Sequence, residues 1–295
     1  MKISVVTVTF NSGKTVEDTI KSVLSQEYKD YEYLIVDGGS KDNTVEIVKK
    51  YEPLFEGRMR WISEKDKGMY DGINKGIRMA TGDVVGIINS DDFYHRTDIF
   101  DKINEAFSGR DEVRGERDER LEVRGEREEV RGEREEVRGE RYVNCKRGDR
   151  VEAIYGDVRF VNPDNLEKTV RYYSSKNWRP WRFRFGFMPA HPSFFTLREN
   201  FEKYGYYQYD YHIAADYELL IRHLYTNKVP AKYIPLDFMK MRTGGRSTDG
   251  IQANIRLNKE IVRACAENGI WTCMPLLFLK YFVKVFELVF TRGES

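Results

Sequence analysis

Apolar residues alternate between two patterns over the first third of the chain. Short β-branched runs at 3–10 (ISVVTVTF) and 31–37 (YEYLIVD) are each followed by turn residues and then by apolar residues at helical spacing. The alternation continues with a predicted strand near 61–62, a helix over about 69–80 and a fully apolar strand over 84–88. Strands that alternate with helices predict an α/β fold with a mainly parallel central sheet flanked by helices.

The remaining elements follow the same two patterns less regularly. We expect a helix over 98–108 and a strand over 153–160 (AIYGDVRF). A helical pattern then follows Ala215, two short strands lead to Gly244, and a helix ends near Asn268.

A charged repeat separates the two halves of this pattern. The hexapeptide Glu-Val-Arg-Gly-Glu-Arg begins at 112, 122, 129 and 136, and each heptad offers one Val and one Gly, which excludes a coiled-coil seam. We expect residues 110–141 to form an exposed insertion, partly helical or disordered, that the fold can lose. An arginine-rich RNA-binding arm is the alternative interpretation. It is disfavoured because the Glu residues neutralise the charge of the Arg residues and no aromatic residue is interleaved with them.

The C-terminal segment is amphipathic. Residues 275–290 are almost wholly apolar except for Lys280, Lys284 and Glu287, which share one face of a helix. A bilayer span needs roughly 20 apolar residues, so this segment is too short and too polar to cross one. We expect it to lie on a membrane surface, and the alternative is packing on the domain or on a dimer partner.

Charge and cysteine content exclude several classes of protein. The 49 Lys and Arg nearly balance the 48 Asp and Glu, so no nucleic-acid partner is expected. Cys145, Cys265 and Cys273 are an odd number without metal-site spacing, which argues against a disulfide framework or a zinc site. These features favour a cytoplasmic protein, and the amphipathic C-terminus adds the expectation of peripheral attachment to the inner face of the plasma membrane.

Polar residues follow the predicted strands where a ligand site is expected. Asn11, Asp37 and the pair Asp91-Asp92 come directly after three strands, and in parallel α/β sheets ligands bind beyond the carboxyl ends of the strands. Adjacent carboxylates are suitable ligands for Mg²⁺ or Mn²⁺, which complete their shells with water and phosphate oxygens. For a bare Asp-Asp pair, capping of the next helix is the simpler interpretation.

The order of several further motifs favours metal binding over helix capping for the Asp91-Asp92 pair. The chain contains SVVTVTFN, VDGGSKDNT, EKDKGMYDGINKG and NSDD within its first 92 residues, followed later by HPSFF, AADYEL and GGRS. This order resembles glycosyltransferase family 2, whose members have the GT-A fold. The resemblance implies a nucleotide-sugar-binding half at 1–109, an acceptor-binding half at 142–268, and the attachments 110–141 and 269–295.

The resemblance assigns donor-side roles to eight residues. Those matching the base and ribose positions are Thr9, Asn11, Asp37 and Asp91, and those matching the donor-pocket block are Asp71, Asn74 and Lys75. Asp92 matches the ligand of the divalent cation, Mn²⁺ or Mg²⁺. The first position of this aspartate element is Ser90, a variation that leaves the metal role intact.

The later motifs supply the acceptor side. Asp216 matches the general base; the neighbouring acid that many members carry is Ala215 here, so Glu218 is the fallback base. His191 matches a block near the acceptor. A loop that closes on the donor is expected at Gly244, Gly245 and Arg246, with Arg242 as a second arginine within reach of a diphosphate.

The implied activity is inverting transfer of a sugar, with a UDP-sugar as donor and a lipid-linked or polysaccharide acceptor. A non-catalytic GT-A-like scaffold is the alternative function. A dinucleotide-dependent oxidoreductase is disfavoured, because Asn11-Ser12-Gly13-Lys14 does not supply the Gly-x-Gly-x-x-Gly turn. The sequence carries no prediction of the sugar, the linkage or the oligomeric state.

Overall fold

The computed structural model describes residues 1–109, 141–144, 149–244 and 250–278. Its strands are β1 (Ile3–Thr9), β2 (Tyr31–Asp37), β3 (Met59–Ser63), β4 (Val84–Ile87), β5 (Phe93–Tyr94), β6 (Arg141–Val143), β7 (Ala153–Asn162), β8 (Asn165–Tyr173), β9 (Phe195–Leu197) and β10 (Ala231–Arg242). The α-helices are α1 (Val16–Leu24), α2 (Thr44–Tyr51), α3 (Met69–Met79), α4 (Ile99–Phe107), α5 (Arg198–Tyr204), α6 (Ala215–Ile221) and α7 (Gly250–Glu267). Short 3₁₀ turns are η1 (Glu52–Phe55), η2 (Pro180–Phe185) and η3 (His191–Ser193), and α6 continues into a π-helical turn, η4 (Arg222–Thr226).

The strands of the described residues form one ten-stranded mixed sheet. Its order is β3-β2-β1-β4-β9-β7-β10-β5, with β6 paired to β10 and β8 paired to β7. Strands β3, β2, β1 and β4 are parallel neighbours, as the alternating pattern predicts. The second half departs from the prediction, because β9 is antiparallel to both β4 and β7 while β10 is parallel to β7. The α/β class is confirmed, and the sheet is mixed.

The prediction of two short strands before Gly244 is wrong. One strand of twelve residues, β10, occupies this region and shifts its register against β7 between Tyr233 and Met239. Pro235 lies within the irregular stretch. Because proline has no N–H to donate, the ladder is interrupted there, which explains why the sequence pattern shows a break that the fold absorbs as a bulge.

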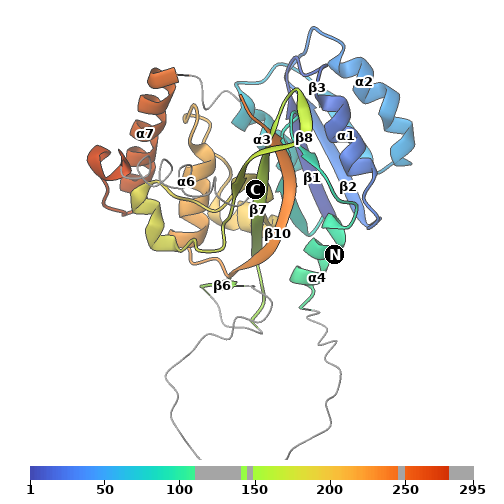
Figure 1. Ribbon diagram of the computed structural model, residues 1–295. Coiled ribbons are helices and arrows are strands. Elements are labelled where there is room, and N and C mark those ends of the chain that lie inside the picture. The colour runs from blue at the N-terminus through green and yellow to red at the C-terminus, as the bar shows by residue number, and fades with distance from the viewer. Residues whose placement is uncertain (110–140, 145–148, 245–249, 279–295) are drawn as a thin grey trace, which may run out of the picture.

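Helices cover both faces of the sheet. Apolar side chains of α1, α2 and α4 share one core with one face of the sheet, and those of α3, α6 and α7 share the core on the other face. Figure 1 shows α2 and α7 on opposite sides of the molecule. Helix α3 approaches β1 so closely that a Cβ at Gly76 would lie 2.3 Å from the Val6 side chain. The central strands are buried on both faces, which explains their continuous apolar runs.

The two attachments lie mostly outside the described residues. Arg141 is an exception, because it pairs with Tyr233 and so belongs to β6 rather than to the predicted insertion. At the other end, residues 274–278 are helical and Leu277 is fully buried in the core that α7 shares. Across the described ranges, none of the helices combines the length and the apolar character needed to cross a membrane.

One carboxylate that is buried in the sheet has its partners within the protein. Glu32 on β2 accepts hydrogen bonds from Ser4 and Thr81 and an ion pair from Arg60 at 2.7 Å. Burial raises the pKa of this carboxyl, but these partners outweigh burial and lower the pKa to about 2. The ionised form therefore stabilises the fold.

Replacing Glu32 by Gln is expected to lower the free energy of unfolding by about 2 kcal/mol at neutral pH, because buried donors lose a charged acceptor. The folded-state pKa lies below the ordinary value of 4.5, so this difference should be full above pH 4.5 and shrink as the pH falls toward 2. Urea denaturation at several pH values measures it, with the exposed Glu46→Gln as control. A difference that does not change with pH would contradict the role assigned to Glu32.

Candidate active site

Three parallel strands end at the same level and present polar side chains. Thr9 pairs in register with Asp37, and Asp37 pairs with Ser63. The Asp37 carboxylate is 1% exposed and accepts hydrogen bonds from the Ser63 hydroxyl at 2.6 Å and from the backbone N–H of Gly39 and Ser40. Asp37 therefore fixes the loop after β2 at the edge of the site.

The loop after β1 is connected to two neighbouring loops. Asn11 has a left-handed backbone (φ 51°), donates its N–H to the Ser40 hydroxyl and accepts a hydrogen bond from Lys41 N–H. The hydroxyls of Ser12 and Ser90 lie 2.9 Å apart, which joins this loop to the one that carries the aspartate pair. Thr9, just before the loop, has a buried hydroxyl that finds no hydrogen-bond partner among the residues that the structure describes. Buried polar groups usually have partners, so Thr9 offers a group for a ligand.

Asp91 and Asp92 follow β4 in very different environments. Asp92 is 2% exposed, whereas Asp91 is half-buried. Burial, reinforced by the neighbouring Asp91 charge, raises the pKa of Asp92 well above its ordinary value. Asn89 donates to the Asp92 carboxylate at 3.1 Å, and the Arg242 guanidinium binds the Asp91 carbonyl oxygen and the Asp18 carboxylate.

This donor set fits a hard divalent cation. Within the described residues no three His, Cys, Asp or Glu side chains form a preformed metal cluster. Mg²⁺ and related cations are commonly held by one or two carboxylates, with water and substrate phosphates completing the shell. Asp91 and Asp92 supply such carboxylates, and a cation that neutralises them would offset the electrostatic cost of burying Asp92.

Helix α3 carries the three predicted donor-pocket residues and brings two of them, Asp71 and Lys75, together. Lys75 pairs with Glu64 at 2.7 Å and with Asp71 at 3.6 Å. Asn74 is 2% exposed and exchanges two hydrogen bonds with the backbone of Tyr207. In this structure Asn74 joins α3 to the segment between α5 and α6.

Asp216 lies at the first turn of α6 and is half-buried. Desolvation raises the pKa of this carboxyl to about 6, although the N–H of Tyr217 bonds to it at 2.7 Å. The hydroxyl of Tyr70, from α3, donates to the carbonyl oxygen of Ile213 at 2.5 Å and so fixes the approach to α6. The pKa of the Asp216 carboxyl group is therefore close to neutral pH, so the group is ionised at pH 7 and able to take up a proton.

His191 belongs to the same neighbourhood. Its Nε2 lies 2.7 Å from the Tyr207 hydroxyl, and the Tyr207 ring stacks on Tyr70. Burial lowers the pKa of His191 to about 4, so the ring is neutral at pH 7. The turn that contains His191, η3, packs against both β4, which precedes the Asp91-Asp92 pair, and α6, which carries Asp216.

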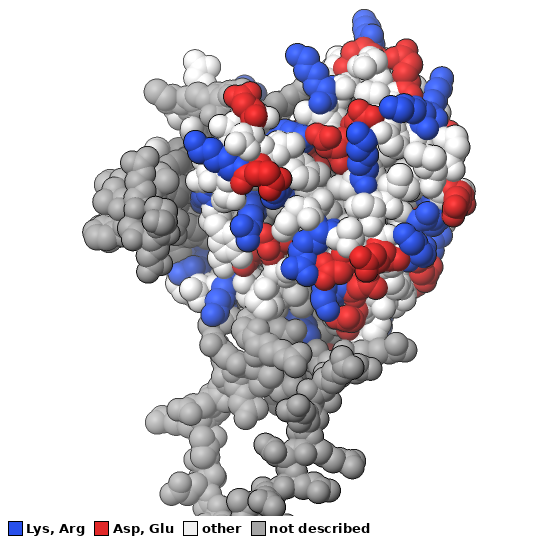
Figure 2. Space-filling view, turned by 45° about the vertical axis from the view of Figure 1, so that its right-hand side comes forward, with Lys and Arg blue, Asp and Glu red and all other residues white. Residues whose placement is uncertain are grey.

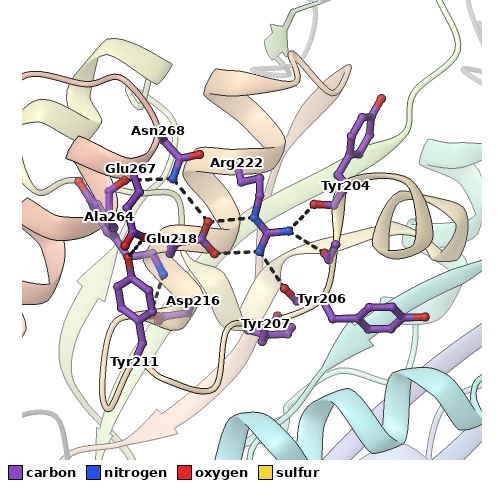
Figure 3. A network of polar contacts seen from close by, with 12 residues as sticks. Tyr204, Tyr206, Tyr207, Tyr211, Asp216, Glu218, Arg222, Ala264, Glu267 and Asn268 are labelled. Atoms are coloured by element: carbon purple, nitrogen blue, oxygen red, sulfur yellow. Dashed lines mark hydrogen bonds and ion pairs between the residues drawn. The ribbon is translucent and has the colours of Figure 1, made fainter.

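The fallback base, Glu218, has a different role. Its carboxylate is 1% exposed and forms a two-pronged ion pair with Arg222 at 2.8 and 2.9 Å. Arg222 also donates to the carbonyl oxygens of residues 204–206 (Figure 3). At Gly205 (φ 94°) a Cβ would lie 2.8 Å from the guanidinium, so glycine permits this contact. Glu218 holds a loop, and it is not available as a base.

Sequence reasoning missed Glu260. This residue of α7 accepts hydrogen bonds from three consecutive backbone N–H groups, those of residues 212–214, at 2.9 to 3.0 Å. Its charge also contributes to the raised pKa of Asp216. No local motif marks Glu260, because its partners are backbone groups more than 40 residues earlier.

The flexible-loop prediction falls largely outside the described residues. Gly244 is exposed with φ 97°, a conformation suited to glycine, and one residue, Thr243, separates it from β10. Gly245 and Arg246 are not among the described residues.

Comparison with known proteins identifies the family of this chain. A family model described as glycosyl transferase family 2 matches residues 4–205, most of the chain. The chain belongs to glycosyl transferase family 2. The match includes the ends of β1, β2 and β4 and ends before α6, so the family 2 model covers the donor-side residues and His191 but not Asp216.

Curated relatives of this family 2 chain match shorter segments. A Mycobacterium tuberculosis (strain H37Rv) protein named as an uncharacterized glycosyltransferase is 38% identical over 112 residues, 38% of this chain and 42% of the relative. A PGL/p-HBAD biosynthesis glycosyltransferase of Mycobacterium bovis BCG is 30% identical over 109 residues, 37% of this chain and 42% of that protein. The chain thus matches less than half the length of these relatives.

Solved structures of glycosyltransferases share the fold. S. aureus TarS 1–349 in complex with UDP-GlcNAc superposes with a TM-score of 0.57 at 15% identity, over 92% of this chain and 68% of that chain. The mannosyltransferase PcManGT from Pyrobaculum calidifontis, in complex with GDP-Man and Mn²⁺, superposes with a TM-score of 0.52 at 14% identity, over 97% and 80% of the two chains. At these identities the likeness establishes the GT-A fold of this family 2 chain.

The different roles of Glu218 and Asp216 predict opposite effects on stability. Glu218→Gln is expected to lower the free energy of unfolding by about 3 kcal/mol, because it leaves the Arg222 charge buried without its counter-ion. Asp216→Asn is expected to raise it by about 1 to 2 kcal/mol above pH 7, because a carboxylate with a raised folded-state pKa is unfavourable when ionised.

The sign of the Asp216 effect sets its pH dependence. The cost of the ionised group is absent below the ordinary pKa of 3.8 and complete above about 6, so the gain from Asn should vanish at acid pH. Chemical denaturation below pH 3.8 and above pH 7 measures this gain in the free energy of unfolding. Asp30→Asn, at an exposed position, is the control and should leave that free energy unchanged. Equal destabilisation by both site variants would contradict the distinction.

Proposed function

We propose that the protein is an inverting, metal-assisted sugar transferase that uses a nucleotide-sugar, a UDP-sugar in our proposal, and a lipid-linked or polysaccharide acceptor. The observation that carries this proposal is a pair of carboxylates with different environments. Asp92 is buried beside a second acid at the carboxyl edge of the sheet, whereas Asp216 stands apart on α6 with a pKa near 6. The first suits a cation that accompanies a diphosphate, and the second suits a base.

The donor would lie along the ends of β1, β2 and β4. In the proposal, the unpartnered Thr9 hydroxyl, Asn11, Asp37 and Asp91 contact the nucleoside, and Asp71 and Lys75 border the donor pocket. Asn74 shapes the pocket from behind through its two bonds to Tyr207. A cation held by Asp92 would offset the negative charge that develops on the departing diphosphate.

The acceptor hydroxyl needs a base, because it is a poor nucleophile when protonated. Asp216 would take the hydroxyl proton while the acceptor oxygen bonds to the anomeric carbon and the bond from that carbon to the diphosphate oxygen breaks. A single attack from the side opposite the leaving group inverts the configuration, and no second carboxylate is needed as a nucleophile. The neutral ring of His191 and the hydroxyl of Tyr207 would border the acceptor.

The comparisons support a nucleotide-sugar donor, but they do not identify its nucleotide or its sugar. Structures with the same fold are described in complex with UDP-GlcNAc in one case and with GDP-Man and Mn²⁺ in another. A relative named as a PGL/p-HBAD biosynthesis glycosyltransferase supports the class of reaction, and the acceptor remains part of our proposal. A scaffold without catalytic activity, the alternative function, predicts neither metal-dependent nucleotide binding nor turnover.

Metal-dependent binding of a nucleoside diphosphate is the first expected result. A nucleotide present at a hundred times its dissociation constant should stabilise the protein by about 2.7 kcal/mol. This stabilisation should require Mn²⁺ or Mg²⁺ and disappear in Asp92→Asn, because the amide lacks the charge that binds the cation. Thermal unfolding against UDP, GDP and other nucleotides measures it, with Asp30→Asn as the matched control. Stabilisation of equal size without metal would contradict the role of Asp92.

Asp216→Asn is expected to lower kcat by a factor of roughly 10² to 10⁴ while leaving metal-dependent nucleotide binding intact. The rate of the unchanged protein should rise with pH to a plateau, with a midpoint near 6, because only the ionised carboxylate accepts a proton. Release of nucleoside diphosphate at several pH values measures both effects. A variant with unchanged kcat would move the base to another residue, although the nucleotide site would still stand.

A further inference from the structure

One stretch of the chain has a strongly one-sided charge. Residues 168–198 contain seven Lys or Arg and no Asp or Glu, in a protein whose total net charge is +1. On the face that Figure 2 brings forward, acidic and basic side chains are interspersed instead. In the described residues, neither Arg182 nor Arg184 forms an ion pair with a carboxylate. These charges are therefore available to a partner.

Exposed aromatic side chains accompany these arginines. In the 3₁₀ turn η2, Trp181 and Arg184 are three residues apart and share the outer side, while Phe183 between them is fully buried. Trp181 is 54% exposed. The Arg182 guanidinium lies 5.6 Å from the centre of its ring.

The segment after α7 joins the same surface. The Thr272 hydroxyl donates to the Arg184 carbonyl oxygen at 2.6 Å, which places Trp271 next to η2. Trp271 is 70% exposed, and Phe278, in the helical turn that follows it, is 45% exposed. We name the surface formed by Trp181, Arg182, Arg184 and Trp271 the aromatic–basic face.

We infer that the aromatic–basic face docks on an anionic phospholipid bilayer. Tryptophan rings are enriched where apolar and aqueous phases meet, and each Arg near an anionic leaflet adds to the attraction. In sequence, Phe278 leads directly into the apolar stretch with Lys280 and Lys284, which has the same character. Aromatic rings beside arginines also stack on the bases of single-stranded nucleic acid. The apolar stretch that follows Phe278 in the sequence offers hydrocarbon contact that a nucleic acid does not use, so the bilayer is the favoured partner.

This surface also lies next to the proposed base. The Tyr217 hydroxyl, one residue after Asp216, donates to the carbonyl oxygen of the buried Phe183 in η2. Docking through η2 would therefore hold the start of α6 toward the membrane. The inference deepens the proposed function by naming how a lipid-linked acceptor is met, yet bilayer binding itself needs no turnover.

The test is sedimentation of the full chain with vesicles of phosphatidylcholine alone and of phosphatidylcholine mixed with phosphatidylglycerol. Binding is expected only to the anionic vesicles, and it should weaken as salt is raised. Arg182→Gln with Arg184→Gln should weaken binding about 25-fold, which is about fivefold for each charge. Trp181→Ala with Trp271→Ala should weaken it as well and reduce the blue shift of tryptophan fluorescence on binding.

Matched controls separate this face from general charge. Lys49→Gln with Lys102→Gln removes one positive charge from each of α2 and α4, which cover the other face of the sheet, and should bind vesicles as the unchanged protein does. Each variant is checked for retained thermal unfolding and for nucleotide binding, so failure of the donor site is seen independently. Unchanged vesicle binding in both face variants, or equally tight binding of an RNA oligonucleotide, would overturn the inference.

Discussion

The parallel pairing of β1 with β2 and β4 is the constraint on which the candidate site depends. It places the ends of three strands at one edge, so that Thr9, Asp37 and the Asp91-Asp92 pair face the same region although more than 80 residues separate the first from the last. The Ser12–Ser90 contact then joins the loops. Polar groups that would be costly inside the sheet become a binding edge, because the chain leaves the sheet where they occur.

Four carboxylates among the described residues show two contrasting environments. Glu32 and Glu218 have arginine partners and several donors, so their ionised forms are stabilised where they lie. Asp92 and Asp216 instead have raised pKa values caused chiefly by desolvation. Carboxyl groups whose ionised form is unfavourable are typical of positions where a ligand binds or a reaction occurs. The acids with arginine partners hold the backbone that positions these groups.

The sequence predicted what local pattern controls. Apolar runs and turn residues located β1, β2, α3 and β4, since each element is specified by its own residues. The second half was harder, because the antiparallel β9 is only three residues long and β10 contains a proline. Residue types also suggested a candidate site, which stays a prediction, but they did not indicate the partners of Glu218 or the backbone role of Glu260. Those depend on contacts across the fold that no spacing in the chain records.

The position of α6 connects these points. Its first turn carries Asp216, Glu260 of α7 holds the backbone just before it, and Tyr217 bonds to η2 just after it. The proposed base is thus held from two sides, by α7 and by η2, and η2 carries Trp181, Arg182 and Arg184 of the aromatic–basic face. A membrane that engages that face would act on η2, one of the elements that would orient the base. An acceptor sugar on a lipid carrier would then need to rise only a short way from the bilayer, with its hydroxyl already on the side of the site where the base lies.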